Sequence, residues 1–259
     1  MNPILSPAGL RRLRELARSR TALILDYDGT LCPIVPRTAN AVIPPRTMRL
    51  LRRAAALYPT AILSGRKLSD VSARVRGCGI REVVGNHGLE WRGSRDSVKH
   101  ERLMRRCRRE IERAMSEGAI HGERIEVEYK KVTLSVHYRM SPNRARAHRE
   151  ILGVLRGFPG TQIIKGKQVF NLLPHTRLNK GTAVVALRKK FRSDRAIYVG
   201  DDWTDEKVFR LKPKSFLLDV RMGRSARSRA RYYLPNIAAM DRFLEELIEL
   251  RSVPALGHE

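Results

Sequence analysis

Three short apolar segments, far apart in the sequence, each end in a group of polar residues. The segments are residues 22–25, 61–63 and 196–199, and the groups that follow them are Asp26-Tyr27-Asp28-Gly29-Thr30, Ser64-Gly65-Arg66 and Gly200-Asp201-Asp202. Short apolar runs bounded by turn residues are typical of buried parallel strands. In an open α/β sheet, ligands bind beyond the carboxyl ends of the strands. The sequence therefore predicts a parallel sheet whose carboxyl edge brings these polar groups together.

Two carboxylates one residue apart at the end of a strand suit the transfer of a phosphoryl group. Asp26 can attack phosphorus and form an aspartyl-phosphate, while Asp28 can protonate the leaving oxygen and then accept a proton from the hydrolytic water. The Ser64 hydroxyl and the Gly65 N–H can donate to phosphoryl oxygens. Lys180, at the head of a helical pattern, supplies a compact positive charge. We predict catalytic roles for Asp26, Asp28, Ser64 and Lys180, and a phosphate-binding role for Gly65.

A carboxylate cannot easily approach a phosphate dianion unless a hard cation lies beside both. Mg²⁺ commonly binds one or two protein carboxylates together with substrate phosphate. The predicted ligands are Asp26, the backbone carbonyl of Asp28, and Asp201. Asp202 and Asp205 are expected next to this site, supporting the ligands or holding Lys180. Each of these motifs alone is an ordinary loop sequence, and it is their order, each after a buried-strand pattern, that favours a shared site.

These segments, in this order, resemble the motifs of the haloacid dehalogenase superfamily of phosphohydrolases. The segment from Asp26 to Leu31 resembles the first motif, Ser64 the second, Lys180 the third and residues 200–206 the fourth. The resemblance implies an α/β fold: a Rossmann-like parallel sheet core with helices on both faces, plus an inserted α+β cap domain.

Within this superfamily the chain resembles the trehalose-6-phosphate phosphatases. The shared segments are residues 25–35, 63–66, 85–90, 127–130 and 136–139, and the resemblance covers most of the chain. It implies Mg²⁺-dependent hydrolysis of trehalose 6-phosphate to trehalose and phosphate, with a trehalose-phosphate synthase as a partner in the same pathway. It also implies substrate contacts by Arg66, Asn86, His87, Glu128, Lys130, His137 and Arg139. Gly85 and Gly88, which flank Asn86 and His87, indicate a close approach of the backbone to another group.

Two positions depart from the usual pattern of that family. Where it has Glu-Val-Arg-Pro before the catalytic lysine, this chain has Asn171-Leu172-Leu173-Pro174, and Leu178 replaces an aromatic residue. The amide of Asn171 thus replaces a carboxylate expected to touch the sugar. The change leaves the phosphatase chemistry intact, whereas it leaves the identity of the sugar open. Hydrolysis of another sugar phosphate by the same mechanism is the alternative.

The region between the second and third motifs has the pattern of a helix and two strands, repeated once. The predicted elements are a helix over 98–118, strands over 125–130 and 132–139, a helix over 143–156 with Ser141 as its N-cap, and strands over 162–165 and 168–172. This predicts an α+β cap over residues 93–170 and a catalytic core formed by residues 1–92 and 171–259.

Apolar and polar residues alternate in the first strand pair of this region, which predicts one buried and one polar face. The polar face is expected to carry Glu128, Lys130, His137 and Arg139. Mixed donors and acceptors on a sheet suit the many hydroxyls of a sugar. The alternative is a face that is merely solvated, as is common in antiparallel sheets.

The formal net charge of this 259-residue chain is +26, from 52 Lys and Arg against 26 Asp and Glu. Such an excess is found in nucleic-acid-binding proteins. Here it is spread from Arg11 to Arg231, aromatic residues are sparse, and no zinc-finger spacing occurs. We expect a solvated, Arg-rich surface that attracts an anionic substrate, and neither a nucleic-acid partner nor a non-catalytic sensor. Residues 221–231 are the best candidate for contact with a polyanion.

The cysteines and the apolar runs predict the compartment. Cys32, Cys78 and Cys107 are odd in number and lack metal-site spacing, so we expect free thiols in a reducing cytoplasm. No run approaches the length of a membrane span, and residues 1–20 have a helical pattern without the apolar core of a signal peptide. The expected protein is cytoplasmic and has no membrane partner.

Overall fold

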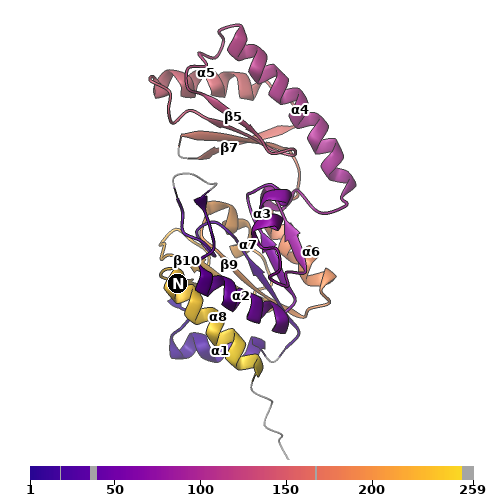
Figure 1. Ribbon diagram of the computed structural model, residues 1–259, viewed down its shortest axis with the longest axis vertical. Coiled ribbons are helices and arrows are strands. Elements are labelled where there is room, and N and C mark those ends of the chain that lie inside the picture. Colours follow the sequence, from indigo (N-terminus) through magenta and orange to yellow (C-terminus); the bar gives the residue numbers. More distant parts are fainter. Residues whose placement is uncertain (18, 36–39, 167, 253–259) are drawn as a thin grey trace, which may run out of the picture. The chain divides into compact units, whose positions relative to one another are not determined.

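The computed structural model describes residues 1–17, 19–35, 40–166 and 168–252, which form two compact units (Figure 1). One unit is Met1–Gly88 with Leu178–Glu259, and the other is Leu89–Arg177. The boundaries predicted from the sequence lie after residues 92 and 170, and the compact units divide after residues 88 and 177. Residues 171–177 lie in the second unit because its sheet continues through Pro174.

The first unit contains a parallel sheet, in which the described residues form seven strands in the order β1-β11-β10-β9-β2-β3-β4. Their bounds are Asn2–Pro3 (β1), Thr21–Leu25 (β2), Thr60–Leu63 (β3), Glu82–Val84 (β4), Arg195–Gly200 (β9), Leu217–Met222 (β10) and Tyr232–Leu234 (β11). The three strands that the sequence predicted before the polar groups are confirmed as β2, β3 and β9. The chain runs from β2 to β3 toward one edge of the sheet and from β9 to β10 toward the other edge. Ligands of such sheets bind where neighbouring strands diverge in this way, which here is beyond the carboxyl ends of β2 and β9.

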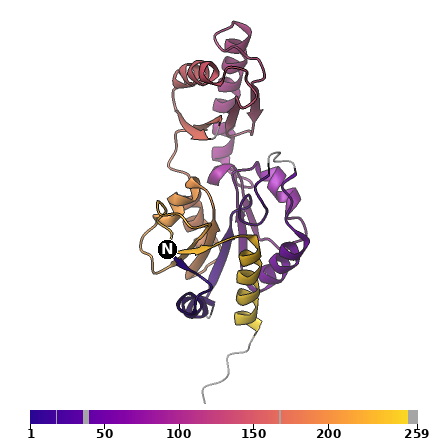
Figure 2. The ribbon, with the colours of Figure 1, turned by 90° about the vertical axis from the view of Figure 1, so that its left-hand side faces the viewer.

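Helices cover both faces of this sheet (Figure 2), as the sequence predicted. The helices are α1 (Pro7–Ala17), α2 (Pro45–Leu57), α3 (Leu68–Arg74), α6 (Lys180–Lys190), α7 (Glu206–Phe209) and α8 (Ile237–Ser252), with short 3₁₀ turns η2 (Asn86–Gly88) and η3 (Trp203–Asp205). Buried side chains of α1, α2 and α8 form one core with β2 and β9. On the other side, α6 contacts β2, β3 and β9.

The start of α6 is determined by local sequence. The side chain of Asn179 accepts from the backbone N–H of Gly181 and of Thr182, and the Thr182 hydroxyl accepts from the Asn179 N–H. This reciprocal capping box satisfies donors that a helix start leaves open. Lys180 is therefore held at the first position of α6, directly beside the carboxyl edge of the sheet.

The second unit has a four-stranded antiparallel sheet in the order β5-β6-β8-β7 and two helices. The elements are α4 (Arg95–Ser116), β5 (Glu126–Tyr129), β6 (Leu134–His137), α5 (Arg144–Arg156), β7 (Thr161–Gly166) and β8 (Val169–Pro174). Met104 and Ile111 of α4 and Ile151 of α5 pack with Leu134 and Phe170 of the sheet in a separate core. The predicted order of helix, strand and strand, repeated once, is confirmed.

The predicted N-cap of α5 is wrong by two residues. The side chain of Asn143, not of Ser141, accepts the backbone N–H of Arg146 at 3.0 Å. An N-cap must stand directly before the first helical residue. Because Pro142 and Asn143 lie between Ser141 and α5, Ser141 is too far from the helix to cap it.

Two further findings concern the whole set of described residues. None of their helices has both the length and the apolar composition that a membrane span requires. Cys32, Cys78 and Cys107 are buried and form no disulfide, as expected from the sequence.

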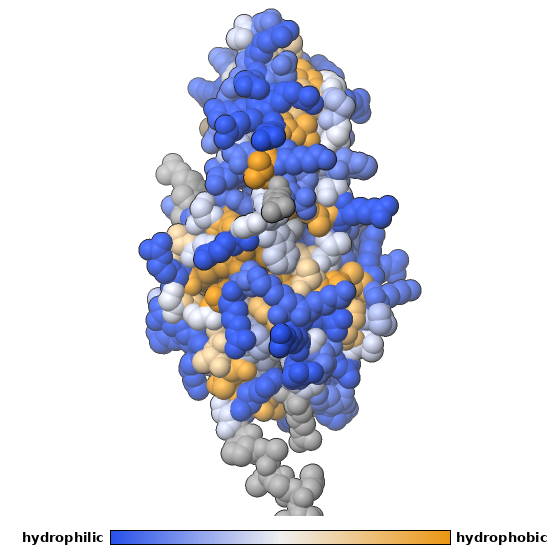
Figure 3. All heavy atoms as spheres, turned by 90° about the vertical axis from the view of Figure 1, so that its right-hand side faces the viewer, coloured by the Kyte–Doolittle hydropathy of each residue, from blue (hydrophilic) through white to orange (hydrophobic). Residues whose placement is uncertain are grey.

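Hydrophilic side chains cover most of the face drawn in Figure 3, and apolar groups occur between them in smaller areas.

A buried ion pair in β10 leads to a prediction about stability. Asp219 is fully buried and accepts from Lys214 Nζ at 2.6 Å and from Arg231 Nε at 2.8 Å. Asp219→Ala leaves both cations without this partner, so the free energy of unfolding should fall by about 3 kcal/mol in urea titrations. The control is Asp194→Ala, because Asp194 pairs with Arg20 at 3.4 Å on an exposed surface, and its loss should be about 1 kcal/mol or less. Equal losses in the two variants would contradict this account.

Candidate active site

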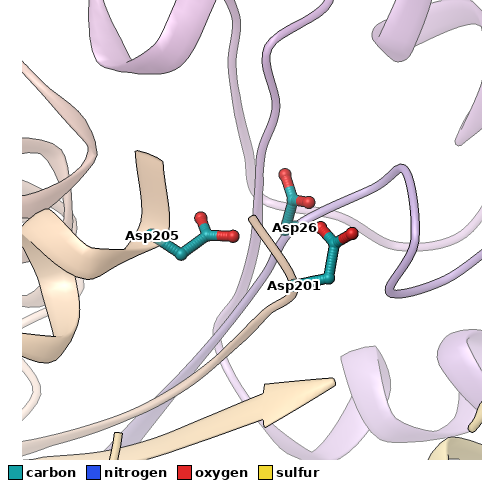
Figure 4. Close-up of side chains that lie close together, drawn as sticks. All are labelled: Asp26, Asp201 and Asp205. Carbon is teal, nitrogen blue, oxygen red and sulfur yellow. The ribbon is translucent and has the colours of Figure 1, made fainter. Parts of the chain in front are cut away.

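The carboxylates predicted to be catalytic or metal-binding meet where β2 and β9 end. Leu25 pairs with Val199 in the parallel ladder, and the Asp26 N–H donates to the Val199 carbonyl at 2.9 Å. Asp26 and Asp201 therefore leave neighbouring strands at nearly the same level. Figure 4 shows the side chains of Asp26, Asp201 and Asp205 close together, and one carboxylate oxygen of each lies within 4.8 Å of the others.

A buried ammonium group joins two of these carboxylates. Lys180 Nζ donates to Asp26 Oδ1 at 2.8 Å and to Asp205 Oδ1 at 2.7 Å, and the lysine side chain is 2 % exposed. Burial by itself would lower the pKa of Lys180, but the charges and hydrogen bonds of Asp205 and Asp26 raise it. Burial raises the pKa of Asp26, and the charge of Lys180 opposes this rise. Lys180 thus holds the predicted nucleophile in place and keeps its own charge.

Asp205 has donors at both of its oxygens. Oδ1 accepts from Lys180 and from the Tyr198 hydroxyl at 2.6 Å, and Oδ2 accepts from the Asp202 N–H at 2.8 Å. Asp205 therefore holds Lys180, which is one of the two roles predicted for it from the sequence. The side chain of Asp202 accepts from the Trp203 N–H at 2.6 Å and caps the short turn η3.

Asp201 lies where a glycine leaves room for its carboxylate. Gly29 has φ +75°, and a Cβ atom at this position would lie 2.1 Å from Asp201 Oδ2. Burial, followed by the charge of Asp205, raises the pKa of Asp201 to about 6. With Asp26 and Asp201, the site offers hard oxygen donors beside a cavity, which is the donor type that Mg²⁺ prefers. The residues present therefore fit a magnesium ion.

The cavity beside these carboxylates has a volume of about 270 Å³. Its lining contains seven of the predicted site residues and four residues for which no role was predicted. The lining residues are Asp26, Asp28, Ile34, Val35, Ala41, Gly65, His87, Lys180, Asp201, Asp202 and Thr204. Groups from the ends of β2, β3 and β9 and from the start of α6 thus share one space, as the strand pattern predicted.

Asp28, the predicted proton carrier, is held by Arg66. Arg66 Nε donates to Asp28 Oδ2 at 2.7 Å and Nη2 donates to Oδ1 at 2.6 Å, which is a bidentate ion pair. Arg66 is also bound to Asp70 at 2.8 Å, and Asp70 accepts from Arg74 at 2.8 Å. The resemblance predicted that Arg66 contacts the substrate, whereas here its guanidinium binds Asp28. Asp70 and Arg74 were missed, and the i, i+4 spacing from residue 66 to 70 to 74 was the available signal.

The connectors after β3 and β4 bring Ser64, Gly65 and His87 together. Ser64 Oγ accepts from the Arg66 N–H at 3.1 Å, and the Ser64 carbonyl accepts from the His87 N–H at 2.9 Å. A Cβ atom on Gly65 would lie 2.5 Å from the His87 ring, so only glycine permits this approach. Asn86 and His87 have φ values of +48° and +58°. His87 lines the cavity, whereas Asn86 is fully buried and does not.

The second unit has a polar sheet face, as the alternation predicted. Glu128 Oε2 lies 3.1 Å from Lys130 Nζ and 3.4 Å from His137 Nε2. Burial would raise the pKa of Glu128, but the hydrogen bond to His137 and the charge of Lys130 together lower it to about 2. Glu128 is opposite Ser135 and Ser135 is opposite Asn171, so all three belong to one face across β5, β6 and β8.

Asn171 and Arg139 occupy different surroundings in this unit. The Ser135 hydroxyl donates to Asn171 Oδ1 at 2.7 Å, so the amide belongs to the polar face. Arg139 lies beyond the end of β6 and is exposed, and it lines a separate hollow with Arg124 and Arg144 near the start of α5. The prediction that Arg139 belongs to the polar face is therefore wrong. Ser135 was missed as a candidate, although the same alternation placed it on that face.

Residues 24–232 match the family described as trehalose-phosphatase. The chain belongs to this family. Residues 24–232 contain the four motifs around the cavity and the whole of the second unit, so the match covers both compact units.

Individual relatives agree with this assignment. The chain is 32 % identical over 230 residues to probable trehalose-phosphate phosphatase 2 of Oryza sativa subsp. japonica, covering 76 % of this chain and 59 % of the rice protein. It is 28 % identical over 269 residues to probable trehalose-phosphate phosphatase E of Arabidopsis thaliana, covering 94 % and 75 %. A crystal structure of Aspergillus fumigatus trehalose-6-phosphate phosphatase has a TM-score of 0.64 and 23 % identity, covering 96 % of this chain and 99 % of that one. At this identity the structural likeness shows the fold.

Two glycines with the same backbone conformation test the metal site. Gly29 and Gly77 have φ +75° and +74°, but only at Gly29 would a Cβ atom meet a neighbour, Asp201 Oδ2, whereas nothing lies within 4 Å of a Cβ at Gly77. Both Gly29→Ala and Gly77→Ala should lower the free energy of unfolding by about 1 kcal/mol. Only Gly29→Ala should also weaken Mg²⁺ binding, by about tenfold or more, because it displaces a ligand. Calorimetric titration with Mg²⁺ measures this, and equal affinities in the two variants would argue against Asp201 as a ligand.

Proposed function

We propose that this protein is a phosphoric monoester hydrolase that converts trehalose 6-phosphate to trehalose and phosphate. The observation that carries the proposal is the pair of contacts by which Lys180 joins Asp26 and Asp205 at the edge of the sheet, beside Asp28. This arrangement, in a chain of the trehalose-phosphatase family, suits a carboxylate nucleophile with a proton carrier next to it. The relatives named above are called trehalose-phosphate phosphatases, which supports trehalose 6-phosphate as the substrate.

In the proposed reaction, Asp26 attacks phosphorus and the bond from phosphorus to the sugar oxygen breaks. Asp28 gives its proton to that oxygen, and trehalose leaves. A water molecule then attacks the aspartyl-phosphate, Asp28 accepts the proton of this water, and phosphate leaves Asp26 unchanged. Lys180 offsets negative charge on Asp26 and on the phosphoryl group. Asp26, the Asp28 carbonyl and Asp201 would hold Mg²⁺, whose positive charge would lower the repulsion between the carboxylate and the phosphate.

The bidentate pair of Asp28 with Arg66 has a consequence for this reaction. Both carboxylate oxygens of Asp28 accept from Arg66. Because an Arg66 donor faces each oxygen, Asp28 has to turn away from Arg66 and take up a proton from water before it protonates the sugar oxygen. Arg66 remains anchored to Asp70 when this happens. We propose that the vacated donors of Arg66 then bind a phosphoryl oxygen, which retains for Arg66 a role in binding substrate.

The polar sheet face of the second unit is proposed to recognise the sugar. Glu128, Lys130, His137 and Asn171 offer both donors and acceptors on one surface, which suits a ligand with many hydroxyls, and the buried Ser135 hydroxyl holds Asn171. Asn171 replaces the carboxylate usual in related enzymes, and this favours a second candidate, the hydrolysis of a different sugar phosphate. We propose that the second unit is a specificity domain for the catalytic core. The buried, unpaired cysteines support a reducing compartment such as the cytoplasm.

A screen of phosphate release tests the activity. The protein with Mg²⁺ should release phosphate from trehalose 6-phosphate faster than from other sugar phosphates, and excess chelator should abolish the release. Asp26→Asn should lower turnover by more than about 10³-fold with the fold intact, because an amide is a poor nucleophile. Circular dichroism provides the control for folding. Turnover close to that of the parent in the Asp26→Asn variant would exclude the covalent mechanism.

Asn171 tests the identity of the sugar. Asn171→Glu retains an acceptor for Ser135 and adds a charge that strengthens a hydrogen bond from a sugar hydroxyl by roughly 1.5 kcal/mol, so KM for trehalose 6-phosphate should fall about tenfold. Asn143→Asp is the control, because it adds the same charge to this unit and keeps the N-cap acceptor of α5. If Asn171→Glu instead raises KM, and the parent prefers another sugar phosphate, the second candidate is correct and the phosphatase assignment stands.

A further inference from the structure

Tyr198 is a buried tyrosine in the central strand β9, with its hydroxyl directed at the catalytic group of charges. It has no exposed surface, and its neighbours in the ladder are Ile24 of β2 and Asp219 of β10. Its ring lies 6.0 Å from that of Phe209, at an angle of 63°. Strands on both sides and this aromatic neighbour leave the side chain little freedom. The tyrosine therefore presents its hydroxyl from a rigid position.

The hydroxyl donates to the same oxygen that binds the catalytic lysine. Tyr198 Oη lies 2.6 Å from Asp205 Oδ1, and Lys180 Nζ lies 2.7 Å from it. The second oxygen of Asp205 accepts from the Asp202 N–H. A Cβ atom on Gly200 would lie 2.5 Å from Asp205 Cγ, so the glycine allows the carboxylate to lie against the end of β9. Asp205 is thus held by donors from a strand, a helix start and a turn.

Lys180 divides its hydrogen bonds between Asp205 and Asp26, at nearly equal distances. The two carboxylates therefore compete for one ammonium group. A donor that shares the charge of Asp205 weakens its hold on Lys180 and leaves more of the ammonium charge for Asp26. Without that donor, Asp205 would be a buried carboxylate with one partner fewer, and it would draw Lys180 away from the nucleophile.

We propose that Tyr198 is a positioning residue for the reaction: through Asp205, its hydroxyl sets how Lys180 is divided between Asp205 and Asp26. It touches neither substrate nor metal ligand in this scheme, and it acts only through Asp205 and Lys180. This role of Tyr198 rests on the proposed function, because the role assumes that Asp26 receives the phosphoryl group. The opposing view is that the hydroxyl only satisfies a buried carboxylate and contributes to stability.

Tyr58 provides a matched control for this choice. It is also buried in the first unit, and its hydroxyl donates to the Leu247 carbonyl at 2.9 Å, in the core formed with α8. Tyr198→Phe and Tyr58→Phe each remove one buried hydroxyl and one hydrogen bond. Both variants should lower Tm by a similar, small amount. A difference in kcat between the two variants therefore depends on the position of the hydroxyl and not on its burial.

The first measurement is steady-state hydrolysis of trehalose 6-phosphate and of p-nitrophenyl phosphate at saturating Mg²⁺. Tyr198→Phe should lower kcat about tenfold on both substrates and leave KM within about twofold, since the lost interaction acts on the nucleophile and not on the sugar. Tyr58→Phe should retain the parent kcat. A kcat for Tyr198→Phe equal to that of Tyr58→Phe would overturn the proposal.

The second measurement does not depend on turnover. Beryllium fluoride with Mg²⁺ mimics a phosphoryl group on an aspartate, and its binding raises Tm. The rise should be smaller in Tyr198→Phe than in the parent and in Tyr58→Phe. In the Asp205→Asn background, Tyr198→Phe should change this rise less than it does in the parent, because the two residues act in series. Independent, additive effects would overturn the proposal.

These outcomes separate the inference from the proposed function. If the parent hydrolyses p-nitrophenyl phosphate but not trehalose 6-phosphate, the sugar assignment fails, and the kcat ratio of the two tyrosine variants on p-nitrophenyl phosphate still decides the role of Tyr198. If the parent hydrolyses trehalose 6-phosphate and Tyr198→Phe matches Tyr58→Phe in kcat and in the response to beryllium fluoride, the function stands and the positioning role is excluded.

Discussion

The ammonium group of Lys180, buried between Asp26 and Asp205, is the interaction on which the site depends. The carboxylate oxygens of Asp26 and Asp205 lie within 4.8 Å of each other in a buried site, and the ammonium between them offsets their repulsion. The capping box of α6 holds Lys180 at the helix start, and the β2–β9 ladder brings Asp26 level with the loop that carries Asp205. Backbone geometry therefore determines which charges surround the carboxylate of Asp26.

Glycines make this crowding possible. Gly29 leaves room for the carboxylate of Asp201, Gly200 for that of Asp205, and Gly65 for the ring of His87. In each case a Cβ atom would lie within 2.5 Å of the neighbouring side chain, a distance that real Cβ atoms do not reach. Polar and charged side chains can thus come close together at the ends of three strands because the glycines there have no side chain. The glycines of the motifs belong to the site as much as the acids do.

The cavity and the polar sheet face belong to different compact units. All residues that line the cavity beside Asp26 come from the first unit. The second unit has its own hydrophobic core and a polar sheet face on which Glu128, Ser135 and Asn171 lie opposite one another. Asn171 stands on that face, so a substitution there leaves the residues that line the cavity unchanged.

The sequence by itself determined the parallel core and the repeated helix–strand–strand order, because short buried strands, glycine turns and alternating polarity are local patterns. It also predicted that Asp26, Asp201 and Lys180 share one edge of the sheet. The polar face of the second unit followed from the same alternation. The tertiary structure alone decided that Arg66 binds Asp28 and that Arg139 lies apart from the polar face. It also decided that the hydroxyl of Tyr198, an apparent core residue, reaches Asp205. These contacts join segments whose separation along the chain carries no periodic signal, so they depend on how strands and loops pack in space.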